Sequence, residues 1–134
     1  MLKTIINSII DELETAEVEN VYSAFDAYTI ENKGDIFTVI GIGAFETAAP
    51  VYTMAYAYIP FRAEVDISIT APKSMTMDEI YDYYADNIES VLLQMTDMRY
   101  ALKKMSLKFD SNIQRLVLNV KLETGGMAKL ERSL

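Results

Sequence analysis

The sequence predicts an α+β fold, with an antiparallel or mixed sheet of four to five strands and two helices packed on one face. Three observations predict it. Residues 61–70 alternate strictly between apolar and polar side chains, which is typical of a strand with one buried face. Residues 2–13 and 80–95 place apolar side chains at intervals of three and four, as amphipathic helices do. The other extended segments are grouped between and after these helices, which favours separate layers of helix and sheet.

The first third of the chain predicts a helix, a short strand and a longer strand. The isoleucine and leucine stripe places the helix at residues 2–15, and Val21–Phe25 is a short extended segment. Ile36–Phe45 is rich in β-branched and aromatic residues, as strands are. Gly41 and Gly43 lie two apart on one face of this strand. Because no third glycine and no helix follow, they favour close approach of another backbone or a large side chain over a nucleotide site.

A tyrosine-rich segment follows at residues 51–60. In an extended conformation, Tyr52, Tyr56 and Tyr58 lie on one face together with Met54, and small side chains lie on the other. Two interpretations stay open. The tyrosines pack in the core or across strands, or they form a partner surface, because tyrosine and methionine are favoured at interfaces. Pro60 separates this segment from residues 61–70, so the two form one bent strand or a hairpin.

The second helix is predicted over Met77–Met95. Thr76 and Glu79 have the spacing of a capping box, in which each side chain accepts a hydrogen bond from the backbone of the other residue. An acidic row runs along this helix at intervals of three and four residues and consists of Asp78, Asp82, Asp86 and Glu89. The row is open to three interpretations: a solvated face, a contact with a basic neighbouring molecule, or a cation site.

The last third of the chain predicts an antiparallel hairpin over Met105–Leu122, because two alternating runs flank a turn-forming Asp-Ser-Asn sequence. Gly125 and Gly126 then break the alternation. We therefore expect one α+β domain over residues 1–124 and a flexible C-terminal tail over residues 125–134.

Composition argues against an enzyme. The sequence contains no cysteine and no histidine, which removes thiolate chemistry, disulfides, the commonest metal ligand and every serine–histidine arrangement. Carboxylates, lysine and tyrosine remain for acid–base chemistry, but no spacing among them nominates a pair. We predict a non-enzymatic protein with no catalytic residue, no cofactor and no metal site.

The charge distribution suggests protein partners. A net charge of −8 disfavours nucleic acid and anionic membranes. Residues 1–98 hold four Lys/Arg and seventeen Asp/Glu, whereas residues 99–134 hold eight and three. Opposite charges of this kind can join identical subunits head to tail. The candidate interface residues are Arg62, Glu64, Asp66, Asp78, Asp82, Asp86, Lys103, Lys104, Lys108, Arg115, Tyr52, Tyr56 and Tyr58.

The order of elements resembles the tail terminator family of long-tailed phages and prophages, together with related minor tail and head–tail joining proteins. The matching pieces are the opening helix, the strands Ile36–Phe45 and Phe61–Thr70, the acidic helix Met77–Met95 and the closing hairpin. The resemblance implies a structural virion protein that forms a homo-oligomeric ring, commonly a hexamer, on the tail tube and contacts other tail proteins.

Localisation follows from the same reasoning. No apolar run approaches the roughly 18–20 residues that span a bilayer, so we expect a soluble protein in the cytoplasm at synthesis. The resemblance places it in the virion tail after assembly. The alternative function is a small-molecule-binding or enzymatic α+β domain with a pocket lined by the tyrosine segment.

Overall fold

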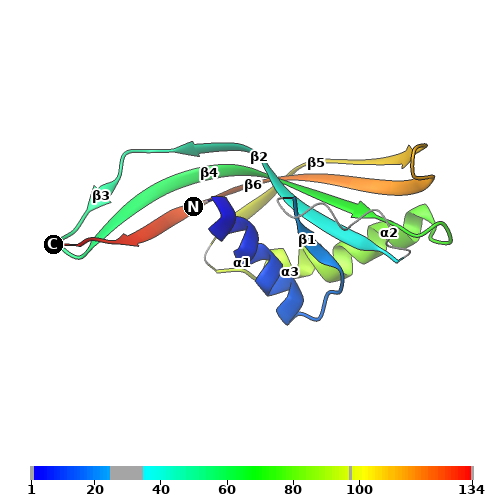
Figure 1. The fold of residues 1–134 in the computed structure, drawn as a ribbon, viewed down its shortest axis with the longest axis horizontal. Helices are drawn as coiled ribbons and strands as arrows, with labels where there is room; N and C mark the ends of the chain where they lie inside the picture. The colour runs from blue at the N-terminus through cyan, green and yellow to red at the C-terminus, as the bar shows by residue number, and fades with distance from the viewer. Residues whose placement is uncertain (1, 25–34, 97, 134) are drawn as a thin grey trace.

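The computed structural model describes residues 2–24, 35–96 and 98–133 of the chain (Figure 1). Its sheet has six strands in the order β1-β2-β4-β6-β5, with β3 beside β4. All strand pairs are antiparallel except β1 with β2, so the sheet is mixed. The elements are α1 (Leu2–Thr15), β1 (Val21–Ser23), β2 (Phe37–Thr47), β3 (Val51–Tyr52), β4 (Tyr56–Thr70), α2 (Met77–Tyr83), the π-helical segment η2 (Tyr84–Glu89), α3 (Ser90–Leu92), β5 (Arg99–Asp110) and β6 (Arg115–Glu131).

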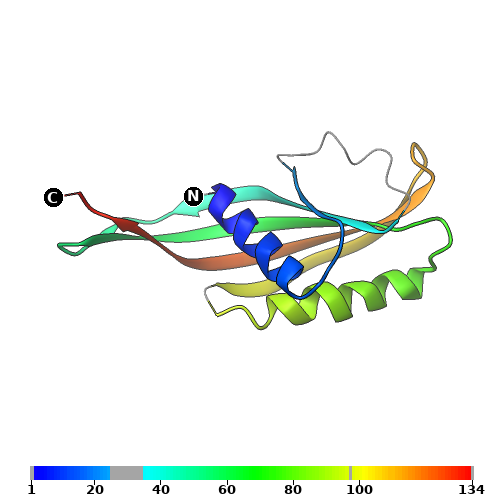
Figure 2. The same ribbon diagram turned by 60° about the horizontal axis from the view of Figure 1, so that its bottom comes forward.

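The α+β class is confirmed, and the sheet is larger than the four to five strands expected. Both helical segments lie on one face of the sheet (Figure 2). Alternate β4 side chains enter the core beneath them, as the strict alternation predicts: Val65, Ile67 and Ile69 are at most 1% exposed. Ile9 of α1 and Ile80 and Ile88 of the second helix are fully buried against this layer. Among the described residues, no helix is long and apolar enough to cross a membrane.

The second helical segment begins where its capping box predicts. The Glu79 N–H donates to the Thr76 hydroxyl at 3.3 Å, and the Thr76 N–H donates to the Glu79 carboxylate at 3.2 Å. The segment runs through η2 and ends at Leu92, not at Met95. Met95 donates its N–H to the Leu92 carbonyl only three residues back, which tightens the chain out of the α-helix.

The tyrosine segment is not one strand. The chain turns back at residues 53–55, where the Thr53 N–H donates to the Tyr56 carbonyl at 2.8 Å. Tyr52 therefore lies on β3, whereas Tyr56 and Tyr58 lie on β4. The prediction that all three tyrosines share one face of a single strand is wrong. Pro60 lies inside β4, where its carbonyl accepts the Ala48 N–H just beyond the last β2 residue, so its missing N–H removes no bond from the β2 ladder.

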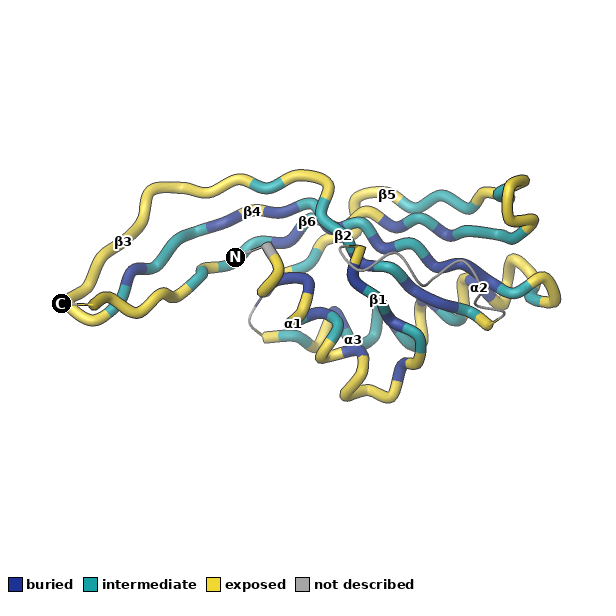
Figure 3. The backbone as a smooth tube through the Cα atoms, viewed as in Figure 1, coloured by how far each residue is buried: buried dark blue, intermediate teal, exposed yellow. Residues whose placement is uncertain are grey.

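The last strand continues through the glycines that ended the predicted hairpin. β6 pairs with β4 from Val117 to Glu131, so residues 125–131 are strand where a flexible tail was expected. The sheet therefore extends beyond the helices that cover it. We call the projecting part the arm: β3, residues 56–60 of β4 and residues 126–131 of β6, at the left of Figure 1. Figure 3 shows that exposed residues dominate β3 and the end of β6.

Candidate interaction surface

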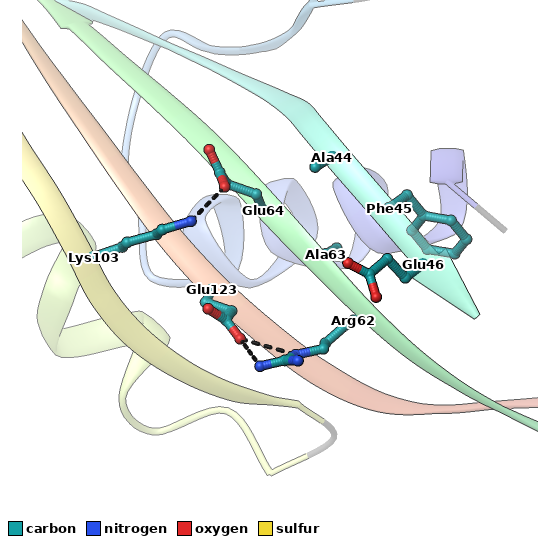
Figure 4. A pocket seen from close by; sticks show the side chains of 8 residues that line it. All are labelled: Ala44, Phe45, Glu46, Arg62, Ala63, Glu64, Lys103 and Glu123. Atoms are coloured by element: carbon teal, nitrogen blue, oxygen red, sulfur yellow. Dashed lines mark hydrogen bonds and ion pairs between the residues drawn. The ribbon is translucent and has the colours of Figure 1, made fainter. Parts of the chain in front are cut away.

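The face of the sheet opposite the helices carries a ladder of ion pairs that join β4, β5 and β6 (Figure 4). Arg62 on β4 donates its Nε–H to Glu123 on β6 at 2.9 Å. The Glu64 carboxylate accepts from Lys103 at 2.8 Å and from Lys121 at 3.4 Å. These cross-strand pairs surround a shallow cavity of about 180 Å³, which Figure 4 shows from close by. The candidates Arg62, Glu64 and Lys103 therefore pair with residues of their own chain.

The pair network changes the ionisation of Glu64. Hydrogen bonds from Lys103 and then from Lys121 lower the pKa of its carboxyl below the usual value of 4.5, and the Glu64 carboxylate raises the pKa of Lys103. A depressed carboxyl pKa stabilises the folded state above the unfolded pKa and ceases to do so as pH falls through the folded pKa.

We expect Glu64→Gln to lower the thermal midpoint at pH 7, because the neutral amide no longer holds the two lysines as a charged acceptor. The difference from the original protein should shrink as pH falls below 4.5 and disappear once the carboxyl is protonated. Thermal unfolding followed by fluorescence between pH 3 and pH 7 measures it. A difference that stays constant over this range would contradict the assignment.

Asp66 lies on the same face, opposite Gly41 of β2 in the ladder. Its Oδ2 approaches Gly43 so closely that a Cβ built there would lie 2.7 Å away. Gly43 occupies the bulge between Ile42 and Ala44, and Gly41 meets the Ala24 Cβ at a corresponding 3.1 Å. The absence of a Cβ therefore leaves room for the side chain of Asp66 at Gly43 and for that of Ala24 at Gly41.

The acidic row lies elsewhere, on the helix layer. Asp78, Asp82 and Asp86 are exposed. Within the described ranges, no ion pair involves them, and no group of acidic residues is arranged to hold a metal ion. A solvated face and a contact with a basic neighbour both remain open for this row.

The basic candidates of the hairpin have separate roles. Lys104 and Lys108 are exposed on β5, an edge strand of the sheet. Arg115 at the start of β6 is engaged within the chain: it donates to the Ala71 carbonyl at 2.7 Å and to the Asp35 carbonyl at 2.9 Å. Its guanidinium also lies over the Phe37 ring, 5.5 Å from the centroid.

The arm holds the tyrosine candidates. Tyr52 is 63% exposed, and the Arg132 guanidinium lies 5.0 Å from its ring centroid. Tyr56 is half-buried, with the Lys129 ammonium 3.9 Å from its ring centroid. The Tyr58 ring lies 6.2 Å from that of Tyr56. Lys129 of β6 and Arg132 just after it thus form cation–π contacts with Tyr56 and Tyr52.

Sequence reasoning missed a groove where the arm meets the helices. The groove encloses about 590 Å³ between the first turns of α1 and the end of β6. Its lining residues are Thr4, Ile5, Ser8, Phe61, Met98, Met127, Ala128, Lys129 and Leu130. Met127 and Leu130 are exposed apolar residues in the segment expected to be a tail. Their apolar character was the feature of the sequence that could have indicated the groove.

No family model matches the chain, and no curated protein matches it. Solved structures that show similarity include two of PilO. One is the core region of PilO from the type IV pilus system of Pseudomonas aeruginosa, at 9% identity over 71% of this chain and 83% of that chain, with a TM-score of 0.27. The other is the type 4 fimbrial biogenesis protein PilO from the same organism, at 8% identity over 95% of this chain and 72% of that chain, with a TM-score of 0.32. Values this low transfer no function to the chain.

The expectation of a phage tail protein is overturned. The two structures described above are pilus proteins, and no family model or curated protein identifies a tail terminator, so the tail function, the ring on a tail tube and the virion localisation are wrong. The alternative of a tyrosine-lined ligand pocket is not supported either. The resemblance rested on the order of elements and on no sequence motif. Unrelated α+β folds share the same order of helices and strands, so this order does not identify a family.

Both descriptions name pilus proteins, and neither names a reaction or a phage tail protein.

Proposed function

We propose that the chain is a non-enzymatic assembly protein that contacts a partner protein through the tip of its arm. One observation carries the proposal. Val51, Tyr52 and Met54 are 54%, 63% and 82% exposed and lie within four residues of one another, on β3 and in the turn that follows it. Figure 3 shows that β3 lies at the exposed end of the arm, away from the helices. Exposed apolar surface of this kind is typical of protein interaction sites.

The tip is suited to a protein partner. Tyrosine and methionine are enriched in the cores of protein interfaces, because they bury a large area and adapt to the opposing surface. Arg132 lies over the Tyr52 ring and donates to the Thr53 carbonyl, and its N–H bonds the Ala55 carbonyl at 2.8 Å. These contacts order the turn before a partner arrives, which reduces the entropy lost on binding.

Site-specific photo-crosslinking in the producing cells tests the proposal. A photoreactive amino acid at position 54 should yield one discrete protein adduct. The same group at position 81 serves as the matched control, because Tyr81 is a 40% exposed aromatic residue on α2. Adducts that are equally diffuse at both positions would contradict a docking tip.

The captured protein is then purified and titrated. Tyr52→Ser combined with Met54→Ser should weaken its binding by about 30-fold or more, since each side chain is placed as a central contact. Tyr81→Ser should leave affinity unchanged, and the thermal midpoints should show that all variants are folded. Equal affinity for the tip variant would refute this function.

A further inference from the structure

One side of the arm leaves a strand position open beside β6. The ladder between β5 and β6 begins with Arg99 opposite Gly125. From Gly126 to Glu131, β6 pairs with β4 on one side and with no strand of the described residues on the other. The Arg132 N–H bonds the Ala55 carbonyl on the β4 side. Because this direction alternates along a strand, the N–H and C=O groups of residues 127, 129 and 131 point to the open side.

The groove at the foot of the arm lies along the same open position. It is lined by Met127–Leu130 of β6, Ile5 of α1 and Met98, which precedes β5. Leu130 is 51% exposed there. An added strand would therefore find backbone partners along β6 and an apolar surface for the side chains on its helix-facing side.

We propose that a second copy of this chain occupies the position, with its own β6 end paired antiparallel to the first about a twofold axis. The inference rests on the proposed role of the arm as a contact element. The two copies use the β6 side of the arm, whereas the exposed tip residues lie on and next to β3, across β4. Because the strands run antiparallel, the helix-covered part of each copy lies beyond the tip of the other and does not obstruct the pairing.

Charge selects the register. Paired side chains must lie on the same face of the sheet, so full overlap of the open segments 126–133 is not allowed, and only two registers leave a single residue of each segment unpaired. One places Lys129 opposite the partner's Lys129, where like charges repel. The other places Leu130 opposite the partner's Leu130 and each Lys129 opposite the partner's Glu131. This second register gains two opposite-charge pairs and an apolar contact at the axis, so it is the one we assign.

The free edge of β5 is protected against the same pairing. β5 carries Arg99, Lys103, Lys104 and Lys108 along its length, and its only acidic residue is Asp110 at the end. Two β5 edges would repel one another, as cationic edge strands generally do. The β6 end is different because Lys129 and Glu131 are complementary across a twofold axis.

Disulfide trapping tests the register, since the chain has no cysteine of its own. Leu130→Cys should form a covalent dimer rapidly under mild oxidation of the purified protein. The two Cα atoms at the axis would lie about 4.5 Å apart, within the range that a disulfide needs. Leu93→Cys is the control, because Leu93 is 68% exposed directly after α3 and lies outside the arm. Cross-linking at 130 that is no faster than at 93 would overturn the proposal.

A mixed experiment separates the two registers. Lys129→Cys and Glu131→Cys should cross-link slowly alone and at least tenfold faster when mixed, because only the mixture places the two thiols opposite one another. Fastest cross-linking of Lys129→Cys with itself would overturn the assigned register. Charge reversal gives a second readout: Lys129→Glu should weaken self-association in sedimentation velocity, and mixing with Glu131→Lys should restore it. These experiments use the purified chain alone, so their outcome is independent of the cellular adduct at position 54. Self-pairing can fail while the adduct still forms, and self-pairing can succeed where no adduct forms.

Discussion

Ile67→Ala should lower the free energy of unfolding by about 3–4 kcal/mol, the largest effect that we expect from a single truncation. Ile67 is 1% exposed at the centre of β4, opposite Ile40 on β2 and Val120 on β6. It lies beneath the helices, so the truncated side chain leaves a cavity that neither neighbouring strand can fill by moving alone. Urea denaturation monitored by circular dichroism measures the change.

Ile59 provides the matched control, since it is the same residue type on the same strand and the same face. It is half-buried in the arm, opposite Ala128 and outside the core cluster. Ile59→Ala should cost about 1 kcal/mol or less, because the site is already open to solvent. Equal losses at positions 59 and 67 would contradict the division of the sheet into a packed core and a projecting arm.

Arg115→Met should cost about 2–3 kcal/mol, the second large effect. The substitution removes the donors to the Ala71 and Asp35 carbonyls and the cation over the Phe37 ring. Ala71 is fully buried, so its carbonyl loses a charged donor where water does not readily replace it. The loss should appear as a lower urea midpoint with an unchanged slope.

Two further variants distinguish this role from a general effect of charge. Arg115→Lys should recover only part of the loss, because an ammonium cannot reproduce the planar fork that reaches two carbonyls and a ring. Lys108→Met removes a positive charge from the exposed β5 edge and should change stability by less than about 0.5 kcal/mol. Full rescue by lysine, or equal losses at positions 108 and 115, would show that the contacts described for Arg115 do not stabilise the fold.

Local pattern predicted most of the elements of this protein. The alternation of residues 61–70 identified a strand and its buried face, and Thr76 and Glu79 located the start of the second helical segment. Periodicity also located the two helices, and their order among the strands predicted that both pack on one face of the sheet. These features depend on side chains within one or two turns of each other, so they can be inferred without knowing the rest of the chain.

The candidate surface was less accessible to such reasoning. Glu64 and Lys103 were both proposed as contacts with a neighbouring molecule, yet they pair with each other across 39 positions of the sequence. Arg115 likewise bonds carbonyls 44 and 80 positions away. The register of the strands brings these groups together. That register cannot be deduced from the sequence of any one segment considered alone.

The sequence by itself determined the α+β class, the buried face of the central strand and the absence of thiol and imidazole chemistry. Tertiary structure alone decided that β6 continues through Gly125 and Gly126, because β4 supplies backbone hydrogen bonds that two glycines could not organise locally. It also decided that the sheet extends past its helices as an arm. The physical reason is the same in both cases: periodicity is a local property of side chains, whereas strand pairing depends on backbone partners far away in the sequence.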